Sequence, residues 1–353
     1  MKSKKHFRIL FLSNHKYIPE MRGGMETTTH QLIGELWRHG ADSSVACGLQ
    51  GGVTSIGIRA KIQKVLFKRS VAIDSILGYR CYRAFGMHEH ISDVIEDAKP
   101  DAVILQGGDK YSELMNGVAR LGLPLISYLH TPDPLPQTKE DRYEKVSYIA
   151  NSKFTARNHP DKAIVLIVPP LVNRMLYETQ TTREFVVFVN PTKYKGLDVV
   201  LGIAHRRPEH RFLFVRTSIK YGPSNEELRS SHIPSNVTLM GPVGDMRKVY
   251  GKAKLVLAPS QCEETWGRIA TEAHCSGIPV LASDAGGLPE SVGKGGVILN
   301  PSSPIDTWVD AFDEILSNYD HYVNNAWCYS RRPEIDPERC VNQLLDHVGL
   351  VCN

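Results

Sequence analysis

The sequence has no apolar run long enough to cross a membrane, and its first residues do not read as a secretory signal. Of its 353 residues, 42% are hydrophobic and 23% are charged, and the net charge is only +4. Such a composition is typical of a soluble globular protein, and the slight charge gives no reason to expect a nucleic-acid partner. The seven cysteines are scattered without paired spacing, which argues against a disulfide framework or a zinc site. We therefore expect reduced thiols and a cytoplasmic protein.

Strand-like apolar runs alternate with helical patterns along nearly the whole chain. The expected strands of the first half are residues 8–13, 44–47, 102–106, 123–129 and 148–151. Those of the second half are residues 185–190, 211–216, 237–241, 255–259, 279–283 and 296–299. This alternation predicts an α/β fold with two doubly wound parallel sheets in tandem. Consecutive prolines stop both helix and sheet, so Pro169-Pro170 marks the linker between the two.

Two carboxylates, Glu264 and Glu272, lie eight positions apart with Trp266-Gly267 between them. The surrounding pattern predicts a strand, a loop and a helix, with Glu264 where the loop meets the helix. Glu272 then falls about two turns into the helix, on nearly the same face as Glu264. A helix N-terminus beside a glycine offers free N–H groups to an anion, and carboxylates accept hydrogen bonds from hydroxyls. Phosphate and hydroxyl binding together predict a nucleotide-sugar site.

The longer stretch around these glutamates reads Ala258-Pro-Ser-Gln-Cys-Glu-Glu264-Thr-Trp-Gly-Arg-Ile-Ala-Thr-Glu272-Ala-His-Cys-Ser-Gly277-Ile-Pro279-Val-Leu-Ala-Ser-Asp-Ala-Gly286-Gly287-Leu-Pro-Glu290. It resembles the signature of retaining glycosyltransferase family four: a Pro-Ser turn, Glu, seven residues, Glu-Ala, Gly-x-Pro-Val and Gly-Gly-x-x-Glu. The resemblance implies the GT-B fold, in which two Rossmann-like domains face each other across a cleft. The expected domains are residues 1–168 on the acceptor side and 169–330 for the nucleotide sugar. The resemblance also implies that the helical segment 331–353 crosses back onto the N-terminal domain.

The resemblance implies transfer of a sugar from a nucleoside-diphosphate sugar to a hydroxyl, with retention at the anomeric carbon. A UDP-sugar donor is favoured, a GDP-sugar is the alternative, and the acceptor would be a glycan, a lipid-linked sugar or a natural product. No Asp-x-Asp pair occurs in the sequence, so neither a metal nor another cofactor is expected. Two alternatives stay open: a nucleotide-sugar-binding subunit without activity, and another GT-B enzyme such as an epimerase. The acceptor, the base and the oligomeric state are not readable from the sequence.

Candidate residues in the first half are a glycine pair and a histidine. Gly23-Gly24 precedes the expected helix 27–39 and would let backbone N–H groups approach a ligand. On spacing alone the pair reads as an ordinary turn, whereas the resemblance places it near the donor phosphates. His130 ends an expected strand, where a histidine is structural as often as catalytic. The resemblance implies that it contacts the donor sugar at the reacting centre.

In the second half, the resemblance implies that cations hold the donor diphosphate. Lys195-Gly196 matches the family pattern, but Asn190 stands where the family usually has arginine. Asparagine is neutral and cannot supply a charged fork. Arg268 is the expected replacement cation, with Arg216 a weaker candidate, and the alternative reading of Lys195 is a solvated surface lysine.

The same resemblance assigns the remaining roles. The expected catalytic residues are His130, Lys195 and Glu264, with Glu264 holding the donor-sugar hydroxyls. The expected donor-binding residues are Gly23, Gly24, Asn190, Gly196, Arg216, Gly241, Trp266, Gly267, Arg268 and Glu272, the last of these on the ribose. Glu290 either caps a helix or contacts the donor hydroxyls. The basic segment 59–70 could lie on an anionic membrane, carry acceptor contacts, or form an ordinary solvated helix.

Overall fold

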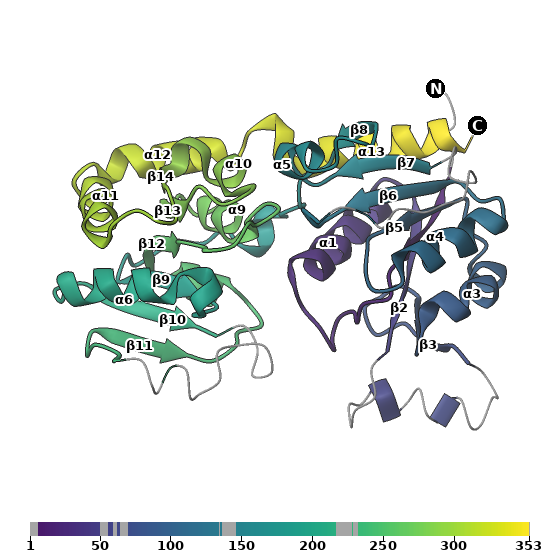
Figure 1. Ribbon diagram of the computed structural model, residues 1–353, viewed down its shortest axis with the longest axis horizontal. Coiled ribbons are helices and arrows are strands. Elements are labelled where there is room, and N and C mark those ends of the chain that lie inside the picture. The colour runs from purple at the N-terminus through teal and green to yellow at the C-terminus, as the bar shows by residue number, and fades with distance from the viewer. Residues whose placement is uncertain are drawn as a thin grey trace. The chain divides into compact units, whose positions relative to one another are not determined.

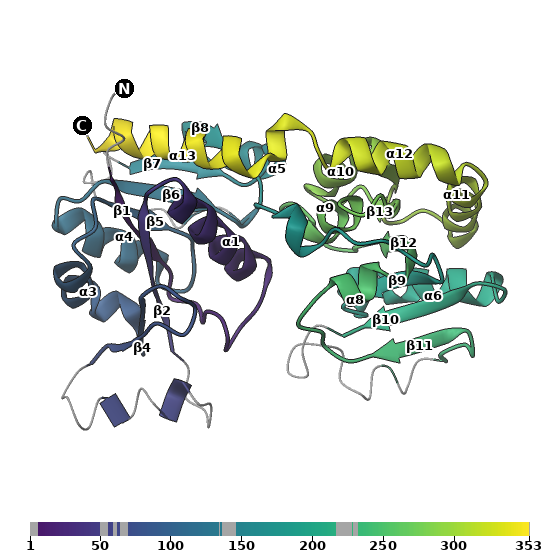
Figure 2. The same ribbon diagram turned by 180° about the vertical axis from the view of Figure 1, so that it is seen from behind.

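The computed structural model describes residues 6–49, 56–58, 62 and 63, 70–133, 135, 146–216, 228 and 232–352. The chain divides into two compact units. The first unit comprises Met1–Leu171 and Asp336–Asn353, and the second comprises Val172–Ile335. The break after Leu171 lies close to the boundary expected after residue 168. Each unit is a sheet with helices on both faces (Figure 1, and from behind in Figure 2).

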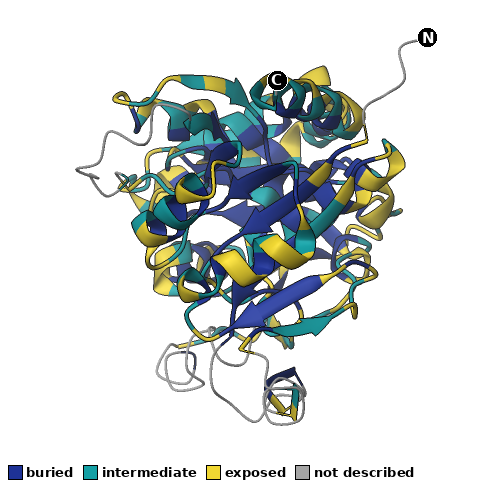
Figure 3. Cartoon of the chain, turned by 90° about the vertical axis from the view of Figure 1, so that its right-hand side faces the viewer, coloured by how far each residue is buried: buried dark blue, intermediate teal, exposed yellow. Residues whose placement is uncertain are grey.

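The first unit is built on an eight-stranded sheet of order β3-β4-β2-β1-β5-β6-β7-β8. Its strands are β1 (Arg8–Leu12), β2 (Asp42–Gly48), β3 (Ala72–Asp74), β4 (Cys81–Ala84), β5 (Ala102–Leu105), β6 (Leu125–Leu129), β7 (Val146–Ala150) and β8 (Ile164–Ile167). All neighbours pair in parallel except β3 and β4, which are antiparallel. Parallel strands buried on both faces need apolar side chains on both, and β5 is apolar throughout, while β1 and β6 depart from this pattern only at Arg8 and Ser127. Figure 3 shows these strands as the buried interior.

Helices cover the first sheet on its two faces. They are α1 (Gly24–Arg38), α3 (Ile91–Ala98), α4 (Tyr111–Arg120), α5 (Lys153–Arg157) and α13 (Pro337–Val351). The apolar face of α1 packs with α13 on one side, and α3 and α4 cover the other. In α13, Val341, Leu344 and Val348 recur at helical spacing and enter the same core as α1. The C-terminal helix therefore belongs to the first unit, although the second unit precedes it in sequence.

The second unit holds a six-stranded, all-parallel sheet of order β11-β10-β9-β12-β13-β14. Its strands are β9 (Phe185–Val189), β10 (Arg211–Val215), β11 (Val237–Met240), β12 (Ala253–Ala258), β13 (Val280–Ser283) and β14 (Gly296–Leu299). Its helices are α6 (Leu197–Arg206), α8 (Arg247–Tyr250), α9 (Arg268–His274), α10 (Leu288–Val292), α11 (Ile305–Ser317) and α12 (Tyr319–Tyr329). Short 3₁₀ turns include η3 (Arg174–Leu176), η4 (Lys193–Lys195) and η5 (Gly293–Gly295). Apolar clusters fill both faces of the sheet.

The predicted α/β class with two parallel sheets is confirmed, and every strand expected from the sequence is present. Three strands were not expected: β3, β4 and β8. In β4, Arg83 interrupts the apolar pattern, yet its side chain is fully buried because Asp74 and the Ile18 carbonyl accept its N–H groups. β3 is only three residues long, and β8 is a partly exposed edge strand. A buried polar residue or a short edge strand gives too weak an apolar pattern to be read from sequence.

Among the described residues, no helix combines the length and the apolar character that a bilayer crossing requires.

Candidate functional site

The candidate residues of the second unit gather at the carboxyl edge of its sheet. Because all six strands are parallel, their carboxyl ends meet at this one edge, where ligands bind in open α/β sheets. Asn190 follows β9, Arg216 follows β10 and Gly241 follows β11. The loop that carries Glu264 follows β12. Residues up to 74 positions apart in sequence, from 190 to 264, thus come to one edge.

Lys195 and Glu264 form an ion pair at this edge. The Nζ atom of Lys195 lies 2.9 Å from Oε1 of Glu264, and the Ser260 hydroxyl donates to the same oxygen. The two side chains are 31% and 17% exposed, so the pair is partly shielded but still open to a ligand. Lys195 ends η4, whose first turn is capped by the side chain of Thr192. The sequence proposed these two residues separately, and the fold brings them together as one charged group.

A glycine pair positions the loop that carries Glu264. Gly286 forms a parallel β-bridge with Glu264, and the N–H group of Gly287 donates to the Glu264 carbonyl at 2.6 Å. A Cβ atom on Gly286 would lie 2.3 Å from the Glu264 carbonyl oxygen, and one on Gly287 would lie 2.4 Å from that of Thr265. Side chains cannot be accommodated at such distances. The Gly-Gly element of the motif is therefore needed for close packing of the loop.

Gly196 and Gly267 also permit close approach between segments. Gly196 has φ +86°, and a Cβ atom there would lie 2.0 Å from the carbonyl oxygen of Pro259. Gly267 has φ +84°, and its Cβ atom would lie 2.4 Å from the Leu288 side chain. Both positions combine a left-handed backbone with a steric limit, so only glycine fits. The absence of a side chain at Gly196 allows the loop that carries Lys195 to contact the residue that follows β12.

The expectation that Glu264 and Glu272 share a helical face is wrong. α9 begins only at Arg268, so Glu264 lies in an extended loop and Glu272 lies about one turn into the helix. The physical reason is Gly267, whose left-handed backbone precedes the helix and separates the loop from it. The two carboxylates consequently have different surroundings.

Glu272 belongs to a buried polar network with Arg268. The Nε atom of Arg268 lies 3.2 Å from Oε1 of Glu272, and its Nη2 atom donates to the Tyr177 hydroxyl at 3.2 Å. The hydroxyl of Tyr250 donates to Oε2 of Glu272 at 2.9 Å. The two charged side chains are only 10% and 11% exposed. Burial raises the pKa of the Glu272 carboxyl, and the charge of Arg268 opposes that rise.

The guanidinium of Arg268 is thus directed toward Glu272 and Tyr177. The diphosphate role expected of it would require this buried pair to open. Trp266 is similarly internal, since it is 4% exposed and its indole N–H donates to Thr271 at 3.0 Å. The side chains of Arg268 and Trp266 therefore make internal contacts around α9 and its preceding loop.

Asn190 has a backbone that suits its residue type. Its φ is +59°, a left-handed conformation that asparagine tolerates better than most residues. Its N–H group donates to the Val215 carbonyl at 2.7 Å, and that of Arg216 donates to the Met240 carbonyl at 3.0 Å. The Oδ1 atom of Asn190 is enclosed and has no hydrogen-bond partner within the described part of the chain. It is a candidate acceptor for a ligand at this edge.

The glycine pair of the first unit lies at the start of α1. Gly24 is the first residue of the helix and Gly23 is its N-cap. The Glu26 carboxylate accepts the Gly23 N–H at 2.9 Å, and a Cβ atom on Gly23 would lie 2.6 Å from that carboxylate. A Cβ atom at position 23 would therefore displace the end of the buried Glu26 side chain.

His130 follows β6 at the carboxyl edge of the first sheet. Its Nε2 atom lies 3.4 Å from the side-chain amide nitrogen of Gln106, whose oxygen accepts from Thr29 at 2.8 Å. The ring also contacts that of Tyr128, with 4.0 Å between centroids. Burial lowers the pKa of His130 to about 3, so the imidazole is neutral at physiological pH. If the Gln106 amide donates to Nε2, the ring proton lies on Nδ1.

Gln106 was not among the expected site residues. It is 4% exposed and directly follows β5, next to β6 in the sheet. A polar residue at the carboxyl end of a buried strand is the signal that could have identified it. Its amide joins α1 to His130 through Thr29.

The structure leaves other expected residues unassigned. Among the described residues, no atom beyond its chain neighbours lies within 4 Å of the position that a Cβ atom on Gly241 would occupy. Glu290 lies in the first turn of α10. Most of segment 59–70, including the part expected to contact a membrane, lies outside the described residues. Within the described ranges, no group of three or more His, Cys, Asp and Glu side chains is placed to hold a metal ion.

Comparison with protein families places this edge in context. Residues 183–318 match the family model described as glycosyl transferases group 1. This match lies within the second unit. The matched range contains Asn190, Lys195, Glu264 and Glu272. The site described above therefore lies within the region that is similar to this family.

Curated relatives are similar over part of the chain. A D-inositol 3-phosphate glycosyltransferase from Segniliparus rotundus is 26% identical over 245 residues, covering 56% of this chain and 54% of the relative. One from Mycolicibacterium smegmatis is 31% identical over 181 residues, covering 44% and 40%. The chain thus spans about half the length, or less, of these curated relatives.

Solved structures resemble the whole chain. The glycosyltransferase from Rickettsia africae superposes with a TM-score of 0.75 at 14% identity, covering 98% of both chains. HepE from Anabaena in complex with UDP gives a TM-score of 0.72 at 16% identity, covering 97% of this chain and 100% of the other. Such low identity shows the fold and nothing more. The chain has the GT-B fold.

Proposed function

We propose that this protein is a retaining glycosyltransferase of family four. It takes a nucleoside-diphosphate sugar as donor and a hydroxyl group as acceptor, and it works without a metal ion. The observation that carries the proposal is the Lys195–Glu264 pair at the carboxyl edge of a glycosyl transferases group 1 domain. The glycines that hold this pair in place match the signature that the sequence displays.

A UDP-sugar is the favoured donor, with a GDP-sugar as the alternative. Support comes from HepE of Anabaena, which has been crystallised with UDP and with UDP-glucose. HepE shares only 16% identity with this chain. A direct binding measurement is therefore needed to decide between uridine and guanosine as the nucleoside of the donor.

Lys195 is the group proposed to stabilise the leaving diphosphate. Breaking the anomeric C–O bond leaves negative charge on the phosphate, and a cation already in place needs no reorganisation to meet it. Lys195 is held by Glu264 on one side and remains 31% exposed on the other, which leaves its ammonium able to contact a phosphate oxygen. A preorganised donor of this kind lowers the barrier by about 3 kcal/mol.

Glu264 is proposed to hold the hydroxyls of the transferred sugar. Lys195 and Ser260 share its Oε1 oxygen, so Oε2 is the oxygen proposed to accept from a sugar hydroxyl. Neither Glu264 nor Glu272 is proposed as a nucleophile. The acceptor oxygen would bond to the anomeric carbon on the face that the phosphate leaves, and its proton would pass to the departing phosphate.

The contacts of Glu272 and the neutral state of His130 limit the roles that we propose for these two residues. A ribose contact by Glu272 would be made by a carboxylate that already accepts from Tyr250 and Arg268. Neutral His130 can donate its one ring N–H to a sugar hydroxyl or to the acceptor, but it does not supply positive charge.

A thermal-shift panel of UDP-glucose, UDP-N-acetylglucosamine, GDP-mannose, UDP and GDP tests donor binding. A ligand at a hundred times its Kd stabilises the native state by about 2.7 kcal/mol, so a matched donor should raise the Tm clearly. Lys195→Ala should lose this shift for the diphosphates. Lys193→Ala is the matched control, because Lys193 is an exposed lysine of the same 3₁₀ turn.

Turnover is then followed with the matched donor, in excess chelator, by NMR of the anomeric proton. The proposal expects an unchanged rate and a product with the donor's anomeric configuration. An inverted product, or a rate that falls in chelator and returns with magnesium, would refute it.

A nucleotide-sugar-binding subunit without activity is the second candidate. Asn190 favours it, because the neutral side chain replaces an expected cation. Donor binding in the thermal-shift panel without donor hydrolysis or transfer would support this candidate over the enzyme.

A further inference from the structure

A cavity of about 260 Å³ lies at the amino edge of the sheet in the first unit. Six of its lining residues carry the argument: Arg8, Trp37, Asp42, Ser43, Tyr79 and Arg80. Arg8 and Asp42 are the first residues of β1 and β2, whereas His130 follows the carboxyl end of β6. The cavity and His130 therefore lie at opposite ends of one parallel sheet.

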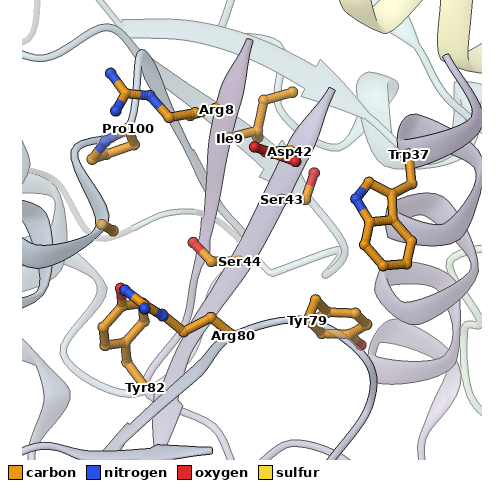
Figure 4. Close-up of a pocket in the computed structure, with 11 residues that line it drawn as sticks. Arg8, Ile9, Trp37, Asp42, Ser43, Ser44, Tyr79, Arg80, Tyr82 and Pro100 are labelled. Atoms are coloured by element: carbon orange, nitrogen blue, oxygen red, sulfur yellow. The ribbon is translucent and has the colours of Figure 1, made fainter. Parts of the chain in front are cut away.

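The register between β2 and β4 creates this cavity. β2 begins at Asp42, but β4 pairs with it only from Val45 onward. Residues 42–44 thus extend beyond their neighbour and leave a gap in the sheet. Figure 4 shows Trp37 and Tyr79 on one side of β2 and Arg80 on the other, so the gap is lined from both faces.

Ser43 presents hydrogen-bonding groups to this gap. The N–H group of Val45 donates to the Arg80 carbonyl, and strand alternation turns the Ser43 backbone to the same side. In the described pairing of β2 with β4, Ser43 has no partner residue, because the pairing starts at Val45. The Oγ atom of Ser43 is enclosed and has no hydrogen-bond partner among the described residues. An enclosed hydroxyl without a partner is costly, so a ligand hydroxyl placed there would remove a penalty.

The other lining groups combine an aromatic face with charges of both signs. Trp37 is 57% exposed, which leaves its indole free for stacking. Arg80 is paired with Asp97 at 2.8 Å, and Asp42 with His6 at 3.2 Å, so both side chains are oriented yet more than half exposed. Arg8 adds a second guanidinium. The lining thus offers donors, acceptors and an apolar ring together.

This combination selects among ligand classes. Asp42 would repel a simple anion, and the exposed indole of Trp37 would not contribute to binding one. Nucleotide-sized ligands need pockets of roughly 300–1,000 Å³, so this cavity is too small for the donor. A sugar ring fits, because it has an apolar C–H face for the indole and hydroxyls that both donate and accept. We propose that this cavity binds one sugar ring of a glycan, apart from the carboxyl edges of both sheets.

The proposal is tested by binding and does not depend on turnover. Purified full-length protein is applied to a microarray of neutral, amino and acidic oligosaccharides. The oligosaccharides that bind are then titrated calorimetrically into the wild type, Trp37→Ala, Trp37→Phe and Ser43→Ala. Trp37→Ala should weaken binding by about tenfold or more, whereas Trp37→Phe keeps a stacking ring and should lose less. Circular dichroism checks that each variant is folded.

Ser43→Ala separates a binding role from a structural one. It should weaken glycan binding while leaving the thermal midpoint unchanged or higher, since it removes an enclosed unpaired hydroxyl. Lys195→Ala should bind the glycan normally, and Trp37→Ala should keep the nucleotide-sugar thermal shift. Three results would overturn the proposal: no oligosaccharide bound by the wild type, glycan binding unaffected by both cavity variants, or glycan binding abolished by Lys195→Ala alone. Failure of the proposed transferase function would appear separately, either as no nucleotide-sugar thermal shift in the wild type or as a shift without donor hydrolysis or transfer.

Discussion

Arg268→Met is the substitution that distinguishes a structural from a ligand-binding arginine. In the wild type, Arg268 neutralises Glu272 inside the second unit, where both side chains are about one-tenth exposed. Methionine approximates the length of the arginine stem but carries no charge. The substitution therefore leaves the Glu272 carboxylate buried with only its hydroxyl donors, Tyr250 among them.

The expected loss of stability is large. Removing one partner of a buried ion pair costs about 3–5 kcal/mol, because the remaining charge is left uncompensated. For a unit of this size that corresponds to a fall in Tm on the order of 10 °C. The double variant Arg268→Met with Glu272→Gln removes both charges and keeps an oxygen that accepts from Tyr250. It should recover most of the loss, since neutral replacement of a buried pair is often tolerated.

The deficit of Arg268→Met should also depend on pH. Burial already raises the pKa of Glu272 in the native state, and loss of Arg268 raises it further. A raised native pKa means that the native state binds a proton more readily than the unfolded state, so stability increases as the pH falls. The deficit should be full at pH 8 and shrink toward pH 5. Glu272→Gln in the same background should abolish that dependence.

Urea denaturation of the wild type, Arg268→Met and the double variant at pH 5 and pH 8 provides the measurement, with each unit's transition followed separately. The reasoning is refuted if Arg268→Met keeps wild-type stability at pH 8. If the same variant then lost nucleoside-diphosphate affinity, Arg268 would instead be the cation that replaces the arginine missing at Asn190.

Three further predictions concern single residues. Gly196→Ala should destabilise the protein more than Gly40→Ala, because φ is +86° and +81° at the two positions but only Gly196 meets a carbonyl, that of Pro259; equal denaturation midpoints would contradict this. Lys195→Ala should lower kcat by roughly a hundredfold or more with little change in Tm, and near-normal turnover would remove it from the leaving-group role. The NMR ring resonances of His130 should not titrate between pH 5 and 8, since burial lowers its pKa to about 3. As the unfolded ring takes up a proton near its ordinary pKa of about 6.5, His130 should reduce stability as the pH falls below that value, and a native titration near 6.5 would show that the ring is solvated.

Local sequence patterns were sufficient for eleven of the fourteen described strands and for their order along the chain. Each expected strand is an apolar run between turn residues, and a run buried on both faces can be read without knowing its neighbours. The order of Pro259, Glu264 and Gly286 along the chain likewise pointed to a nucleotide-sugar site at a strand end. β4 was missed because the burial of Arg83 depends on Asp74, which belongs to a different strand.

The candidate site shows the same division between local and long-range information. From the sequence alone, Lys195 could be a solvated lysine. It pairs with Glu264 because the two loops that carry these residues follow β9 and β12, which are neighbours in the sheet. The contacts of the Arg268 guanidinium with Tyr177 and Glu272 were likewise not readable from the sequence, because Tyr177 lies far from Arg268 along the chain.

The sequence by itself determined the properties that consecutive residues set. These are the periodicity of apolar residues, the turns, and the glycine positions of the motif. Tertiary structure alone decided which charges neutralise one another, because ion pairs such as Lys195–Glu264 join positions far apart in the chain. It also decided the cavity beside Ser43, which arises from an offset in register between β2 and β4. Strand register is a relation between two segments, and no pattern within either segment specifies it.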